Sequence, residues 1–148
     1  MSTADQPIDA VIARWHEFLA SSDQSLLDAL LSEDVTFYSP VVYTPQVGKA
    51  ITMMYLTAAG QALPGESDAG SSDGRTTKFR YTKHVLSGHT AVLEFETTVE
   101  SKYVNGVDII TCNDDGQIIE FRVMIRPLQA VNAVHRQMAA TLERLDNH

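Results

Sequence analysis

The strongest candidate for chemistry in this 148-residue chain is Asp108, a carboxylate set in the apolar run Val107-Asp108-Ile109-Ile110. Alternate side chains of a strand point to opposite faces, so Asp108 and Ile110 share one face while Val107 and Ile109 share the other. A carboxyl group among apolar neighbours is either a functional acid with a perturbed pKa or a structural acceptor of hydrogen bonds. The pattern alone leaves both interpretations open.

The five histidines predict no metal centre, because their spacing contains no HxH, HxxxH or HExxH pattern. The acidic segment beginning at Asp68 does not fit a calcium loop, since its twelfth position is Phe79 rather than a glutamate. We therefore expect neither a metal nor another cofactor. His84 is either a general base in a strand pocket or a partly exposed strand residue.

Composition argues against several classes of partner. The net charge is −8, with 19 acidic and 11 basic residues, whereas nucleic acids and anionic membranes bind basic surfaces. No apolar run approaches the roughly 18 residues of a membrane span, and the first twenty residues do not resemble a signal peptide. With Cys112 as the single cysteine, no intrachain disulfide is possible, and we expect a cytoplasmic location.

Helical periodicity dominates the first third of the chain and its end. Apolar residues recur every three or four positions after Pro7, around Leu26 to Leu31 and over 49–62. A last helix is predicted over 128–146, with a narrow apolar stripe that would pack on its own sheet or on a partner subunit. The Gly-, Ser- and Asp-rich segment 64–77 is predicted to be a flexible loop.

Strand patterns fill the stretch between that loop and the last helix. Strands are predicted over 79–86, 91–103, 107–112 and 118–125, with turns at Ser87-Gly88, Asn105-Gly106 and Asp115-Gly116. An earlier strand is predicted over 35–38. The order predicts an α+β fold in which helices cover one face of a curved antiparallel sheet.

The opposite sheet face is predicted to be charged. Glu94, Glu96, Arg122 and Arg126 alternate along their strands with apolar residues that point the other way. Such a face suits cross-strand pairs or contact with a second copy of the chain. We therefore expect a homodimer formed through the outer face of the sheet.

The order of elements resembles the NTF2-like superfamily, whose α+β cone includes SnoaL-like proteins, ketosteroid isomerases and limonene epoxide hydrolases. The likeness covers residues 8 to about 127, so one domain is expected over 1–148. The ending Val123-Met124-Ile125-Arg126-Pro127 is similar to an uncharacterised SnoaL-like subgroup. The residues that carry the resemblance are Ile12-Ala13-Arg14-Trp15, Ser32-Glu33-Asp34-Val35-Thr36-Phe37, Ser39-Pro40, Val47-Gly48-Lys49-Ala50-Ile51, Gly106-Val107-Asp108 and Asp115-Gly116-Gln117-Ile118.

The resemblance transfers only part of the ketosteroid isomerase machinery. That family uses a tyrosine on its first helix and a protonated aspartic acid on a sheet strand as hydrogen-bond donors, with an aspartate in an Asp-Pro pair as base. Here Trp15 stands at the tyrosine position and Ser39 at the base position, while Asp108 keeps the matching type. The limonene epoxide hydrolase pattern fits less well, because Glu120-Phe121-Arg122 replaces its Trp-Arg-Asp sequence.

The resemblance implies that Asp108 faces a cavity, as an acid or an oxyanion donor. Trp15 and Tyr55 are each either core residues or shapers of the cavity, and Ser39 is either a turn residue or a ligand contact. Phe37, Phe95, Phe121 and Ile125 are equally consistent with the cavity lining and with plain core.

Three functions remain open from the sequence. The cavity could bind a small hydrophobic molecule, of steroid or polyketide type, for an isomerase-, cyclase- or dehydratase-like step without a cofactor. It could instead hold such a molecule without catalysis. In the third case the chain is a dimeric interaction module whose cone is filled by side chains. A second titratable group facing Asp108 would distinguish the first two functions.

Overall fold

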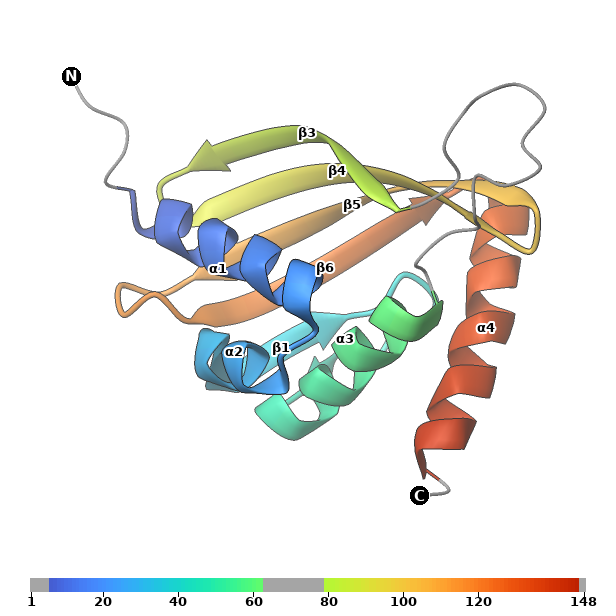
Figure 1. Ribbon diagram of the computed structural model, residues 1–148, viewed down its shortest axis with the longest axis horizontal. Coiled ribbons are helices and arrows are strands. Elements are labelled where there is room, and N and C mark those ends of the chain that lie inside the picture. Colours follow the sequence, from blue (N-terminus) through green and yellow to red (C-terminus); the bar gives the residue numbers. More distant parts are fainter. Residues whose placement is uncertain (1–5, 63–78, 147–148) are drawn as a thin grey trace.

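The computed structural model describes residues 6–62 and 79–146, so the loop predicted over 64–77 lies outside the described residues. The helices in those residues are α1 (Pro7–Ser21), α2 (Gln24–Leu30), α3 (Lys49–Ala62) and α4 (Leu128–Asp146). The strands are β1 (Leu31–Tyr38), β2 (Gln46–Val47), β3 (Arg80–Ser87), β4 (Thr90–Val99), β5 (Lys102–Cys112) and β6 (Ile118–Arg126). Helices α1, α2 and α3 lie on one side of a curved sheet, and α4 stands beside the end of the sheet where β6 finishes (Figure 1).

The six strands form one open sheet in the order β2-β1-β6-β5-β4-β3. The predicted α+β fold is confirmed, but the sheet is mixed rather than wholly antiparallel, because β1 runs parallel to β6. A tight hairpin would force neighbouring strands to be antiparallel, and no hairpin joins β1 to β6. The meander β3 to β6 is antiparallel throughout.

The start of α1 is attached to the hairpin between β3 and β4. Pro7 occupies the first turn, where a missing N–H is tolerated, and the side chain of Asp9 accepts from the Gln6 N–H at 3.2 Å. The Gln6 side-chain oxygen accepts from the Gly88 N–H at 2.7 Å, and the Ile8 N–H donates to the Gly88 carbonyl at 3.0 Å. These bonds fix the helix against β3, which it must approach to build the site described below.

Two apolar clusters stabilise the fold. The larger lies between α1, α2, α3 and the concave face of the sheet, and the smaller lies between α4 and strands β4 and β5. The smaller cluster contains Phe95, Val99, Val104, Ala130, Ala133 and Val134. Within the described ranges, no helix is both long and apolar enough to cross a membrane.

The turn predicted at Asn105-Gly106 is wrong, because both residues lie inside β5. The chain reverses at Glu100-Ser101 instead, where both residues take left-handed backbone angles, with φ of 52° and 64°. Gly106 meets a different requirement. A Cβ there would lie 2.5 Å from Cζ of Phe95 and 2.6 Å from the Met124 carbonyl, so only glycine leaves room for the ring.

The β4 strand consequently ends at Val99 rather than at Tyr103, and β5 begins at Lys102. The first strand also differs from the prediction, since β1 starts at Leu31, which the sequence pattern assigned to the preceding helix. Leu31 is fully buried in the strand, so an apolar residue at this position satisfies either pattern.

Candidate functional site

A cavity of about 930 Å³ opens between the concave face of the sheet and the helices. This volume lies in the range of small-molecule sites. The lining is mainly apolar and comes from α1, α3, β1, β3 to β6, and α4. All eight candidates named from the sequence line it: Trp15, Phe37, Ser39, Tyr55, Phe95, Asp108, Phe121 and Ile125.

Asp108 projects from β5 into this cavity and is 6 % exposed. Burial raises the pKa of its carboxyl from 3.8 to about 7, and a hydrogen bond from Tyr81 partly opposes that rise. The Tyr81 hydroxyl donates to Oδ2 of Asp108 at 2.6 Å. Near neutral pH the carboxyl therefore has a substantial protonated fraction, and a protonated carboxyl can donate a hydrogen bond to a ligand.

Tyr81 receives a second hydrogen bond, because Nε1 of Trp15 donates to its hydroxyl oxygen at 3.0 Å. An indole nitrogen can only donate, so the direction of the chain is fixed from Trp15 to Tyr81 to Asp108. The pKa of Tyr81 lies well above its usual value, chiefly because the phenol is buried and then because Asp108 is adjacent. Tyr81 thus remains a neutral donor over the physiological pH range.

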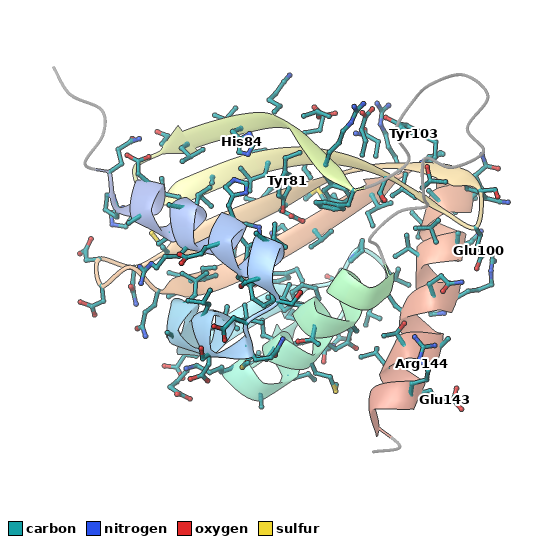
Figure 2. All side chains as sticks on the ribbon, viewed as in Figure 1. Tyr81, His84, Glu100, Tyr103, Glu143 and Arg144 are labelled. Atoms are coloured by element: carbon teal, nitrogen blue, oxygen red, sulfur yellow. The ribbon has the colours of Figure 1, made fainter. Side chains whose placement is uncertain are left out.

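A β-bulge places Tyr81 in the site. Tyr81 pairs with Phe95 and Lys83 pairs with Glu94, so Thr82 is an extra residue in β3. Beyond the bulge His84 pairs with Leu93, and Tyr81 and His84 therefore both face the helices (Figure 2). Strict alternation would put positions 81 and 84 on opposite faces of the strand. The sequence pattern therefore did not identify Tyr81 as a site residue.

His84 meets His16 of α1 beside Tyr81. The two Nε2 atoms lie 3.2 Å apart, and each imidazole ring centroid lies 5.6 Å from the Tyr81 ring centroid. His16 lines the cavity, whereas His84 is exposed to solvent. Burial, and next the charge of His84, lower the pKa of His16, so His16 is a neutral base at pH 7.

Ser39 and Tyr55 lie on the part of the wall built by β1, its following turn and α3. The Ser39 hydroxyl accepts from the backbone N–H groups of Val41 at 3.1 Å and Val42 at 3.4 Å, which is the arrangement of a serine turn. The Tyr55 ring lies 5.3 Å from that of Phe37. Among the described residues, the hydrogen bonds of the Ser39 hydroxyl go to these two backbone groups and not to a base that could activate it.

The charged residues predicted on the outer face lie opposite the cavity and form cross-strand contacts. Arg80 pairs with Glu96 at 2.8 Å. Asn105 donates to Glu94 at 3.0 Å and accepts from Arg126 at 2.7 Å. These groups are engaged with one another and contribute no charge to the Asp108 end of the cavity.

No cluster of three or more His, Cys, Asp or Glu side chains able to hold a metal occurs in the part of the chain that the structure describes. Cys112 is buried on the same side of β5 as Asp108, and burial raises the pKa of its thiol. Among the side chains that line the described cavity, Trp15, His16, Tyr81 and Asp108 are joined by hydrogen bonds or ring contacts.

A scan of protein-family models and a search of curated proteins give no match. Among solved structures, an uncharacterised bacterial protein with a cystatin-like fold from Silicibacter pomeroyi is 35 % identical, with 88 % of this chain and 83 % of that chain covered and a TM-score of 0.74. A steroid delta-isomerase from Pseudomonas aeruginosa is 28 % identical over the whole of both chains, with a TM-score of 0.84. An NTF2-like protein from Mesorhizobium loti shares the fold at 14 % identity, with 86 % of this chain and 97 % of that chain covered and a TM-score of 0.67.

The chain belongs to the NTF2-like superfamily. Within this NTF2-like cone, Trp15 stands where the resemblance to ketosteroid isomerases implies a tyrosine on the first helix. The phenol beside the aspartic acid comes from β3 instead, and the α1 indole donates to it. A tyrosine and an aspartic acid thus lie side by side, but here the tyrosine comes from β3 rather than from the first helix.

Proposed function

We propose that this NTF2-like protein binds a small apolar carbonyl compound, of steroid or polyketide type, in the cavity. The supporting observation is the chain of hydrogen bonds from Trp15 through Tyr81 to Asp108, which ends in a buried carboxyl with a pKa of about 7. The ligand oxygen would accept from protonated Asp108, whose Oδ2 accepts the single hydroxyl hydrogen of Tyr81. The apolar wall would hold its carbon skeleton.

We propose further that these donors support acid–base chemistry of the isomerase type. Donors fixed in an apolar site stabilise negative charge that develops on a carbonyl oxygen when an adjacent C–H bond breaks. The hydrogen bonds from Trp15 to Tyr81 and from Tyr81 to Asp108 hold the Asp108 carboxyl in place, so little reorganisation is needed. The similarity to a steroid delta-isomerase over the whole chain supports this reaction class.

Binding without turnover is the second candidate, and Ser39 favours it. The position that supplies an aspartate base in ketosteroid isomerases holds a hydroxyl already engaged with two backbone N–H groups. The interaction module with a filled cone is disfavoured, since about 930 Å³ is open beside Asp108.

Replacing Asp108 with leucine tests the binding proposal. With 2-naphthol as a fluorescent probe of the donor site, we expect affinity at pH 6 to fall roughly 10- to 100-fold, the typical worth of a strong hydrogen bond. Affinity of the unmodified protein should decline as the pH rises through about 7, because the Asp108 carboxylate cannot donate. Fluorescence titration measures both effects.

Asp34→Asn is the matched control, because Asp34 is exposed on β1. It should bind 2-naphthol as the unmodified protein does. Equal affinity in the Asp108→Leu variant, or no binding to the unmodified protein, would remove Asp108 from a ligand site.

We also propose that the outer sheet face contacts a second copy of the chain. Val85 and Met124 are 52 % and 50 % exposed there, between paired groups of both charge signs. A twofold axis brings one such patch against itself, so glutamates and arginines can meet across it. Met124→Glu should convert a dimer to a monomer in analytical ultracentrifugation, while Asp34→Asn should not. A monomer before substitution would refute this interface.

The proposed location is a reducing compartment such as the cytoplasm. The single cysteine, Cys112, is buried and suits such a compartment.

A further inference from the structure

The pair formed by His16 and His84 is the feature that the proposed function does not yet use. One Nε2 must carry a hydrogen and the other must accept it, because a distance of 3.2 Å joins the two atoms. Two protonated rings would repel each other, so the pair holds either no extra proton or one. It is therefore built to gain a single proton.

The position of the pair connects the cavity with solvent. His16 belongs to the cavity wall, and His84 is exposed on β3. Both rings contact Tyr81, whose hydroxyl donates to Asp108. A ligand oxygen bound by Asp108 would thus lie near a base on the α1 side.

The other titratable groups that line the described cavity do not fit the role of a base. Asp108 acts as the acid, and Tyr81 is a neutral phenol. The guanidinium of Arg80 is paired with Glu96. His135 of α4 lines the cavity, but among the described residues the ring contacts of Tyr81 join it to His16 and His84 and not to His135.

We propose that His16, supported by His84, accepts a proton from the carbon next to the ligand carbonyl. This inference rests on the proposed function, because the carbonyl must be held by Asp108. It gives the cavity the base that Ser39 cannot supply. It also defines the substrate class as carbonyl compounds with a C–H bond next to the carbonyl group.

The step balances without an added reactant. The C–H bond breaks and its electron pair forms a C=C bond, while negative charge moves onto the carbonyl oxygen, which accepts a hydrogen bond from protonated Asp108. The proton goes to the unprotonated Nδ1 of His16, and the Nε2 proton of His16 can pass to Nε2 of His84. Return of a proton to a different carbon completes an isomerisation, whereas return to the same carbon gives exchange.

Exposure of His84 predicts that part of the abstracted proton is lost to water. Deuterium from solvent should therefore enter the substrate during the reaction. Isomerisation and exchange compete for the same intermediate. Deuterium incorporation therefore measures proton removal by His16 and His84 even for a ketone that does not isomerise.

The experiment follows deuterium incorporation from D₂O into cyclohex-3-en-1-one and into a steroid 5-en-3-one by proton NMR. His16→Gln should slow incorporation by roughly 10²-fold or more, as loss of a general base does, and His84→Gln should slow it less. The affinity for 2-naphthol, measured in the same variants, reports separately on the Asp108 donor. Matched controls are His89→Gln, which removes an exposed histidine paired with Asp114, and His135→Gln on the cavity wall.

The pH profile separates a proton acceptor from a structural role. The groups facing His16 are His84 and Tyr81 of β3, with Asp108 of β5 behind Tyr81. Incorporation should rise with pH as His16 loses its proton, then fall as Asp108 ionises near pH 7. His16→Gln should remove the rising limb.

Three outcomes would overturn the role of the pair: no incorporation by the unmodified protein, unchanged incorporation in His16→Gln, or an equal loss in His135→Gln. If 2-naphthol still binds in a pH-dependent way in these cases, the proposed binding function stands and only the base is refuted. Failure of 2-naphthol to bind refutes the binding function itself.

Discussion

Asp108→Asn is expected to stabilise the protein above pH 7 and to leave its stability nearly unchanged near pH 4. The folded protein has an Asp108 pKa of about 7, compared with 3.8 when the group is solvated, so between these values the folded state binds more protons than the unfolded state. Stability contributed by this group is full below pH 3.8 and is lost as the pH rises through about 7. The complete loss amounts to about 4 kcal/mol of unfolding free energy, which is the equivalent of the difference between the two pKa values.

Urea denaturation between pH 4 and 9 measures this effect, with the difference between the unmodified protein and Asp108→Asn isolating the titration of one group. The amide has nearly the same shape and can still accept from Tyr81, so packing is preserved. Asp34→Asn provides the baseline for an exposed carboxylate. A difference that does not grow with pH would show that Asp108 is solvated in the folded protein.

Tyr81→Phe is expected to cause the second large effect, a loss of roughly 10- to 100-fold in deuterium incorporation or turnover, because Asp108 loses the hydrogen bond that holds it in place. The hydroxyl that touches both Trp15 and Asp108 disappears, while the ring that packs on Phe79 and Phe95 stays. The hydrogen bond from Tyr81 lowers the pKa of Asp108, so its removal should raise that pKa. Carbon-13 NMR of the carboxyl group follows the shift.

The control is Tyr55→Phe, which removes a phenol from the α3 wall of the same cavity. It should leave the Asp108 titration unchanged. If Tyr55→Phe and Tyr81→Phe reduced the rate equally, the donors would not be specific to the Asp108 end. An unchanged rate in Tyr81→Phe would exclude Tyr81 as the residue that positions Asp108.

Regular alternation made one part of the site predictable. The period of a strand places Asp108 and Ile110 on one face of β5, and the resemblance to NTF2-like proteins implied that this face borders a cavity. The residues around it were identified as candidates through their family positions and apolar faces. They line the cavity because α1, α3 and the concave sheet face enclose it.

Departures from regular structure explain what the sequence could not reveal. The bulge at Thr82 depends on the pairing of β3 with β4, and no local residue pattern marks it. Tyr81 and His84 therefore reach one face only in the assembled sheet. Asn105-Gly106 is the opposite case, because a strong local turn signal is overridden by packing of Phe95 against the glycine.

Helix α4 has a consequence for which molecules the protein accepts. Val134, Met138 and Leu142 recur on successive turns and line the cavity, and their apolar side chains supply no hydrogen bond to the chain from Trp15 to Asp108. Substitutions along this stripe change the length and contour available to a ligand while the reacting end keeps its geometry. Selectivity and reactivity can therefore diverge independently in this cone, with one helix tuning the former.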